Sequence, residues 1–191
     1  MATFVSRRHD MSLPHALLTA LIEHPGSGSE LAGRFDRSIG HFWHATHQQI
    51  YRELGRLEEA GWIQSLPIEQ GRGRKRAYRI LPTGRKELKR WVREQNDPKP
   101  LRDELMLRLR AEAALGPTGL EEEIRRHLQL HQEKLDLYRR IEAHDFPDKP
   151  GKSEPRDTQL RHLVLKAGIM QESLWVDIST EALGILARDV P

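Results

Sequence analysis

The segment that most limits the fold of this chain is a cationic turn between two short apolar runs. Residues 62–68 and 77–81 are rich in apolar side chains, and runs of this length are typical of β-strands. The residues between them, 69–76, include two glycines and four cationic side chains. Glycine permits the tight backbone of a turn, so the pattern predicts a β-hairpin with a basic tip.

Helical patterns flank this hairpin on both sides. Ser27 and Glu30 fit a capping box, in which each side chain bonds a backbone N–H at the start of a helix. Gly61 is well suited to end a helix. Three helices followed by a hairpin is the order of a winged helix-turn-helix. Apolar residues three and four apart predict the helices, over residues 12–24, from about 28 to before 40, from about 46 to 61 and from about 83 to 95.

Two prolines mark a boundary near the middle of the chain. Pro98 and Pro100 cannot continue a helix and they stiffen the backbone, so residues 96–100 are predicted to be a linker. The expected fold is mainly α with a small β-hairpin wing. Its expected parts are an N-terminal extension (1–10), a winged helix-turn-helix DNA-binding domain (11–95) and a helical C-terminal dimerisation or effector region (101–191).

The C-terminal region is predicted to hold three helices. The first covers residues 101–115, the second opens on a capping box at 118–121 and ends before Pro147, and the third covers about 158–187. A helix of that last length extends about 45 Å, more than a half-chain can cover alone. Its apolar stripe therefore predicts contact with a second copy. The stripe consists of Leu160, Leu163, Val164, Ala167, Leu174, Ile178, Ala182 and Ile185.

Composition excludes several classes of protein. The chain has no cysteine, which excludes disulfide scaffolds, zinc–thiolate sites and cysteine nucleophiles. No apolar run approaches the roughly 18 residues of a membrane span, so we expect a soluble, cytoplasmic protein without a membrane partner. No P-loop, nucleophile elbow or dinucleotide fingerprint is present. We therefore expect no enzymatic activity and no cofactor.

The charges are divided unevenly along the chain. Residues 1–100 carry 17 basic and 11 acidic side chains, whereas residues 101–191 carry 14 basic and 17 acidic ones. Within residues 71–93 there are ten basic groups against Glu87 alone. This asymmetry predicts a polyanionic partner for the first half of the chain. The alternative is a charged face that water solvates.

The helix that ends at Gly61 has the chemistry of a DNA-reading element. A helix fits the major groove, and this one begins with polar, non-acidic side chains that can address base edges. Its acidic Glu58 and Glu59 come at the far end. The cations of the hairpin tip would neutralise phosphates beside the adjacent minor groove. The polar residues are His44, Thr46, His47, Gln48 and Gln49.

Two stretches resemble the PadR family of transcriptional regulators. Residues 46–61 are similar to its recognition-helix signature, with Gln49-Ile50-Tyr51 followed by leucines, Glu58 and Gly61 at matching spacing. Residues 74–85 are similar to the family's second wing strand and its continuation. The resemblance covers residues 11–95 closely, and the helical second half fits the family's dimerisation region more loosely.

The resemblance implies a homodimeric regulator, more in keeping with a repressor than an activator, that binds an inverted-repeat operator in double-stranded DNA. Tyr51 has an alternative role in half-buried packing, and the whole domain has an alternative role as a protein-interaction adaptor, which would not need a cationic wing. The residues that match DNA-binding positions are Thr46, His47, Gln48, Tyr51 and Arg52 in the helix and Arg72, Arg74, Lys75 and Arg76 in the wing.

The chain departs from the family pattern at two positions. Leu81 stands where the family usually has threonine, so the next helix must be capped by Thr83 or remain uncapped, a loss of about 1 kcal/mol. Gln48 stands where a small residue is common. Because its bulk can add a base contact or change the docking angle, the operator sequence does not carry over from the family.

Histidines and aromatic residues raise two further hypotheses. His41, His44 and His47, or His127 with His131, have spacings that can hold a metal, but without a matching carboxylate set we expect none. The resemblance also implies a hydrophobic space for an aromatic small-molecule effector. Ordinary packing is the alternative for its candidate residues, which are Trp91, Tyr138 and Trp175.

Overall fold

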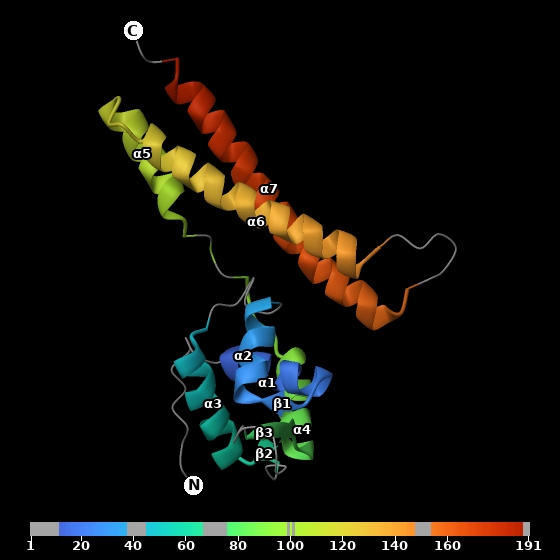
Figure 1. Ribbon diagram of the computed structural model, residues 1–191. Helices are drawn as coiled ribbons and strands as arrows, with labels where there is room; N and C mark the ends of the chain where they lie inside the picture. The colour runs from blue at the N-terminus through green and yellow to red at the C-terminus, as the bar shows by residue number, and fades with distance from the viewer. Residues whose placement is uncertain are drawn as a thin grey trace. The chain divides into compact units, whose positions relative to one another are not determined.

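The computed structural model describes residues 12–37, 45–66, 76–98, 100, 102–147 and 154–188. The chain divides into two compact units, Met1–Pro98 and Lys99–Pro191. Figure 1 shows the helices and strands of each unit along the chain. None of the described helices is long and apolar enough to cross a membrane.

The first unit contains four helices and a small sheet. The helices follow the predicted stripes, and the third one ends just before Gly61, whose φ of 68° suits glycine. The helices are α1 (Ser12–Glu23), α2 (Gly28–Arg37), α3 (His47–Glu59) and α4 (Pro82–Val92), and the strands are β1 (Gly26–Ser27), β2 (Ile63–Ser65) and β3 (Ala77–Ile80).

The sheet differs from the predicted two-stranded hairpin. It has three antiparallel strands in the order β1-β3-β2, with Ile63 opposite Ile80 and Ser65 opposite Tyr78. The extra strand β1 pairs its Gly26 with Tyr78. A two-residue strand of glycine and serine has no alternation and no β-propensity, so its pairing comes from the tertiary fold and the sequence pattern missed it.

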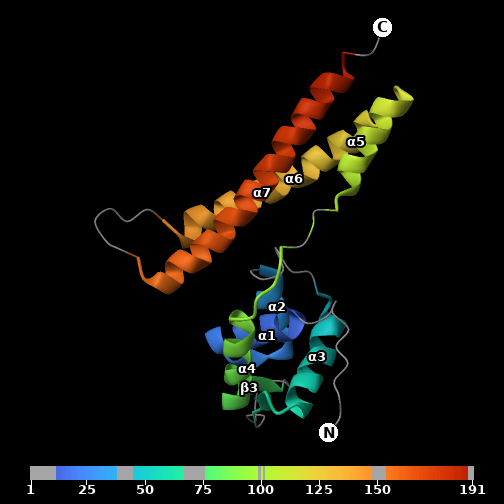
Figure 2. The ribbon, with the colours of Figure 1, turned by 180° about the vertical axis from the view of Figure 1, so that it is seen from behind.

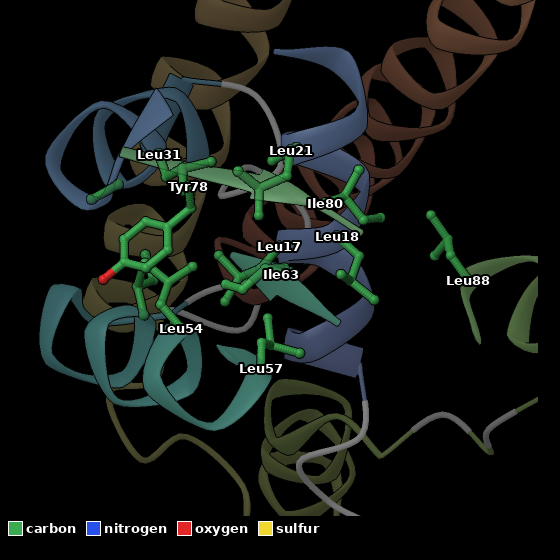
Figure 3. Packing of buried hydrophobic residues seen from close by; sticks show 13 residues of the cluster. Leu17, Leu18, Leu21, Leu31, Leu54, Leu57, Ile63, Tyr78, Ile80 and Leu88 are labelled. Carbon is green, nitrogen blue, oxygen red and sulfur yellow. The ribbon is translucent and has the colours of Figure 1, made fainter. Parts of the chain in front are cut away.

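The core of the first unit lies between the helices and the sheet. Leu17, Leu54, Leu57 and Ile63 are almost fully buried, and Figure 3 shows them converging with Tyr78 between α1, α3 and the strands. Tyr78 and Ile80 share one face of β3, as their spacing predicts. This core fixes the buried side of α3, so its opposite side is left for solvent or a partner.

The second unit consists of α5 (Glu104–Leu115), α6 (Glu121–Asp145) and α7 (Arg156–Leu186). The long helices α6 and α7 lie side by side and run in opposite directions in both views (Figures 1 and 2). Leu105, Ile124 and Ala182 form a small core that joins the three helices. Much of the predicted α7 stripe is exposed, including Leu160, Leu163, Val164, Leu174 and Ile185.

The start of α6 corrects one prediction. Residues 118–121 do not form a capping box, because α6 begins at Glu121 after Leu120, and no side chain caps it. Thr118 instead donates its backbone N–H to Glu112 Oε1 at 2.9 Å, and its hydroxyl bonds the same carboxylate. The hydroxyl that the sequence pattern assigned to the cap of α6 therefore bonds Glu112, a residue near the end of α5.

Candidate nucleic-acid interface

The first turn of α3 is held by a reciprocal cap. Thr46 Oγ1 accepts the backbone N–H of Gln49 at 3.2 Å, and Gln49 Oε1 accepts the backbone N–H of Thr46 at 2.8 Å. This capping box satisfies two N–H groups that a helix start would otherwise leave unpaired. Thr46 and Gln49, two of the side chains expected to address base edges, thus have a structural role at the start of the helix.

The exposed side of α3 is polar and begins without acidic residues. His47, Gln48 and Arg52 are exposed, whereas Ile50 and Leu54 are buried in the core. No acidic side chain lies in the first turn of the helix. The positive end of the helix dipole lies at the start of α3 and favours anions such as phosphate. This side of the helix therefore has the chemistry needed to approach DNA.

Tyr51 lies at the edge of this polar side. Its side chain is 49% exposed, and its ring lies against Gly28 at the start of α2. Among the described residues, its hydroxyl has no hydrogen-bond partner. Tyr51 thus combines the half-buried packing expected as one alternative with an exposed surface that can meet a partner.

The base of the predicted wing is tied to the end of α3. Glu58 Oε1 accepts the backbone N–H of Ser65 at 2.9 Å, and Glu58 Oε2 lies 3.8 Å from Arg76 Nη1. The hydrogen bonds from Ser65, aided by the charge of Arg76, lower the pKa of Glu58 against the opposing effect of burial. Glu58 therefore joins α3 to the end of β2 and to Arg76, the residue just before β3. The sequence pattern did not indicate this role, because it predicts only an outward-facing acid at this position.

The described wing cations are exposed. Arg76 is exposed beside Glu58, and Arg79 on β3 bonds Gln64 at 3.0 Å across the strands. The remaining residues predicted at the wing tip, Arg72, Arg74 and Lys75, lie outside the described residues.

Helix α4 adds cations to the same unit. Its exposed basic side chains are Arg85, Lys86, Lys89 and Arg90. Arg90 is partly neutralised, because it bonds Glu87 at 2.7 Å and Glu94 at 3.1 Å, and these carboxylates raise its pKa. The start of α4 has no side-chain cap, and Thr83 donates its hydroxyl to the carbonyl of Gly61 instead. Of the two expected outcomes, α4 shows the uncapped one.

Trp91, the first predicted effector residue, lies in the first unit. It stacks on the buried His15 with ring centroids 4.5 Å apart and an interplanar angle of 7°. His15 in turn lies 3.2 Å from Glu87. Trp91 is partly buried and packs against the core of this unit, so its contacts are those of ordinary packing.

Tyr138 and Trp175, the other predicted effector residues, lie in the second unit beside a buried carboxylate. Glu172 is 3% exposed, and it lies 2.6 Å from His131 Nδ1 and 2.7 Å from Lys134 Nζ. Trp175 stacks on His131 at 5.7 Å, and Lys134 lies 5.6 Å from the ring centre of Tyr138. Burial raises the pKa of Tyr138. Burial opposes the charge of Lys134, but the hydrogen bond and charge of Glu172 outweigh it and raise that pKa.

Both halves of the chain match known sequence families. Residues 17–90 match the transcriptional regulator PadR-like family, and residues 101–187 match the family described as virulence activator alpha C-term. The probable transcriptional regulator Rv1176c of Mycobacterium tuberculosis is 38% identical over 187 residues, which cover 91% of this chain and 98% of that protein. The chain belongs to the PadR-like family of transcriptional regulators.

The PadR of Bacillus subtilis, named a negative transcriptional regulator, is 29% identical over 93% of this chain and 98% of its own length. Its crystal structure in complex with operator DNA superposes with a TM-score of 0.77 at 27% identity, covering 92% of this chain and 98% of that one. A crystal structure of the same protein in complex with p-coumaric acid matches with a TM-score of 0.72 at 24% identity, covering 92% and 95%.

Another structural neighbour is the virulence activator AphA of Vibrio cholerae. Its structure matches with a TM-score of 0.76 at 26% identity, covering 93% of this chain and 99% of that one. The likeness therefore extends through the N-terminal unit and the helical second unit. It confirms the expected class, a mainly helical winged-helix regulator of PadR type.

The histidines weighed as metal ligands have other partners where the structure describes them. In the second unit, His127 lies 3.3 Å from Glu123 and His131 bonds Glu172. His41 and His44 lie outside the described residues. In the part of the chain that the structure describes, no three metal-ligating side chains come together.

Proposed function

We propose that this PadR-like protein is a homodimeric repressor that binds an inverted-repeat operator and is released by an aromatic small molecule. The observation that carries the proposal is the exposed side of α3, which starts with a capping box, has no acid in its first turn and lies beside a cationic wing base. A surface with this chemistry suits DNA better than it suits a protein partner. The proposed function also implies a cytoplasmic protein.

Within this proposal, the two parts of the DNA surface do different work. The side chains of α3 read base edges in the major groove, where hydrogen-bond donors and acceptors distinguish every base pair. The wing cations neutralise phosphates, which adds affinity without sequence preference. The proposed base-reading residues are His47, Gln48 and Tyr51, with Thr46 at the helix start, and the proposed phosphate contacts are Arg52, Arg72, Arg74, Lys75 and Arg76.

Dimerisation through the second unit is supported by the apolar side chains that α7 leaves exposed. Leu163 is 61% exposed and Leu174 is 55% exposed, and an exposed apolar stripe of this length is typical of an interface. A dimer of this kind sets two recognition helices about 34 Å apart, one turn of DNA. Leu174→Lys is expected to shift the protein towards monomer in analytical ultracentrifugation. An unchanged mass would place the dimer contact elsewhere.

The sign of regulation and the effector rest on the relatives. The Bacillus subtilis relative is named a negative regulator and has been crystallised with p-coumaric acid. We infer repression and an aromatic effector from this likeness, with Tyr138 and Trp175 as the candidate contacts in the second unit and Trp91 as a separate candidate in the first unit. An effector that prefers one arrangement of the dimer would displace the second recognition helix from its half-site.

The experiment that tests the proposal is fluorescence anisotropy across a salt series. The probes are a duplex from immediately upstream of the gene that encodes the chain and a scrambled duplex of equal length. Tight, selective and steeply salt-dependent binding at two chains per duplex is the expected result. The double variant Arg74→Ala/Lys75→Ala should weaken binding to both duplexes and flatten the salt dependence. Equal weak binding to both duplexes by the wild type would favour the adaptor role.

A further inference from the structure

Two helices of the DNA-facing unit meet at a contact that only glycine permits. Tyr51, the fifth residue of α3, lays its ring against Gly28, the first residue of α2. A Cβ atom on Gly28 would lie 2.4 Å from Tyr51 Cε1 and 3.0 Å from Cδ1. Carbon atoms in contact lie about 3.5–4.0 Å apart, so any side chain at position 28 must displace the ring.

Backbone conformation does not explain the glycine. Among the described residues, positive φ angles occur at Gly61, Gly116 and Gly119 and not at Gly28. Alanine is also the better residue within a helix. The explanation that remains for glycine at position 28 is therefore the space that the Tyr51 ring occupies.

The start of α2 has its local shape set by its own cap and its place set by the pairing of the strand before it. Ser27 donates its backbone N–H to Glu30 Oε2 at 2.7 Å, and Ser27 Oγ accepts the backbone N–H of Glu30 at 3.3 Å. The preceding strand β1 is paired with β3 through Ser27 and Ala77. A methyl group at position 28 would therefore move the half-exposed ring of Tyr51 and leave α2 in place.

We propose that Gly28 is a positioning residue for operator recognition. By leaving room for the ring, it fixes the position of Tyr51 on the exposed side of α3, and with it the way the second turn of that helix meets DNA. The proposal rests on the proposed function, because it requires α3 to face an operator. It assigns Gly28 no contact of its own with DNA.

The test is a double-mutant cycle on DNA affinity. The probe is the duplex that the wild-type protein enriches from a randomised pool, with a scrambled duplex of equal length beside it. The variants are Gly28→Ala, Tyr51→Ala and the double variant. Gly33→Ala is the matched control, because Gly33 lies in the same helix and a Cβ there meets nothing within 4 Å.

Gly28→Ala is expected to weaken binding to the enriched duplex by about tenfold, a typical coupling between residues in contact. Its affinity for the scrambled duplex should change much less. Gly33→Ala should bind as the wild type does. In the Tyr51→Ala background, the change at Gly28 should have no further effect, because the ring that it displaces is gone.

Urea unfolding separates positioning from folding. Gly28→Ala is expected to unfold at the same urea concentration as Gly33→Ala, since the ring can swing into solvent. If Gly28→Ala unfolds at a lower urea concentration, the clash with the ring must be the cause, and the double variant must then unfold at the same midpoint as Tyr51→Ala. In that case the test is the comparison of these two variants, which must bind the enriched duplex with equal affinity.

Three results would overturn the proposal. The first is wild-type affinity in Gly28→Ala. The second is an equal loss in the wild-type and Tyr51→Ala backgrounds, which would mean that a methyl group at position 28 collides with DNA itself. The third is a wild-type protein that enriches no duplex, and that result alone would also refute the proposed function.

Discussion

Replacing Glu58 by alanine removes the side chain that joins α3 to the base of the wing. The change deletes the acceptor for the backbone N–H of Ser65 at 2.9 Å and the carboxylate 3.8 Å from Arg76. Glu59→Ala is the matched control. It removes the same charge from the adjacent residue, whose side chain is exposed and forms no hydrogen bond or ion pair with any other described residue.

The loss of stability follows from the exposure of the partners. A hydrogen bond to a charged group contributes about 1.5–3 kcal/mol, but the Glu58 side chain is 31% exposed, so water replaces part of the bond. The ion pair with Arg76 is exposed and contributes roughly 0–1 kcal/mol. We expect Glu58→Ala to lower the free energy of unfolding by about 1 kcal/mol in total, and Glu59→Ala to change it by less than about half of that.

The same change is expected to alter DNA binding in a way that charge alone cannot. Removing either acid reduces repulsion from phosphates, so both variants gain affinity from this effect. Only Glu58→Ala releases the base of the wing from α3. The slope of the logarithm of the binding constant against the logarithm of salt concentration falls by about 0.9 for each phosphate that the protein no longer neutralises. We expect a slope shallower by about 1–2 for each protomer in Glu58→Ala, because one or two phosphates are released, and an unchanged slope in Glu59→Ala.

Urea unfolding and salt-dependent fluorescence anisotropy measure the two effects. The lowered pKa of Glu58 means that its contribution to stability is present above the unfolded carboxyl pKa of about 4.3 and is lost as pH falls through the lowered value. The difference between wild type and Glu58→Ala should therefore narrow in acid. Equal salt slopes in the two variants would refute the idea that Glu58 holds the wing.

Three further predictions concern stability. Thr46→Ala should lower the free energy of unfolding by about 1 kcal/mol through loss of the cap, while Thr46→Ser should not, and equal urea midpoints would refute the capping role. Glu172→Ala should lower the free energy of unfolding by about 2–4 kcal/mol, because it leaves the partly buried Lys134 and His131 without their carboxylate. Glu104→Ala, which removes an exposed carboxylate paired with Arg108, should lower it by less than about 1 kcal/mol. Similar losses in the two variants would contradict the role of Glu172. The raised pKa values of Lys134 and Tyr138 give stability that is full below about pH 10 and falls as pH rises further. Urea midpoints that hold constant up to about pH 11 would contradict the raised pKa values.

Local patterns in the sequence predicted much of the fold. Helix boundaries followed from apolar spacing and from stop signals such as Gly61, and the capping box of Ser27 and Glu30 is present in the structure. These features depend on residues within one turn of each other. The buried leucines of α3 also followed from their spacing, because one side of an amphipathic helix must face the core.

The failures have a common cause in partners that lie outside the residue's own helix or strand. Strand β1 exists because β3 pairs with it. Thr118 bonds Glu112 of α5 and therefore does not cap α6. The position of Glu58 on a helix reveals its exposure but not Ser65 seven residues later. The roles of the predicted DNA-binding and effector residues remain predictions, and those at Arg72, Arg74 and Lys75 lie outside the described residues.

The division of labour along α3 limits how the operator preference of such a regulator can change during evolution. Thr46 and Gln49 are committed to the cap, and Tyr51 is committed to its seat on Gly28. Gln48 and Arg52 are exposed, and no hydrogen bond or ion pair ties either to another described residue. Under the proposed function, substitutions of Gln48 can change the base preference and substitutions of Arg52 the contact to phosphate at little cost in folding. Substitutions at the committed positions must first be compensated elsewhere in the fold.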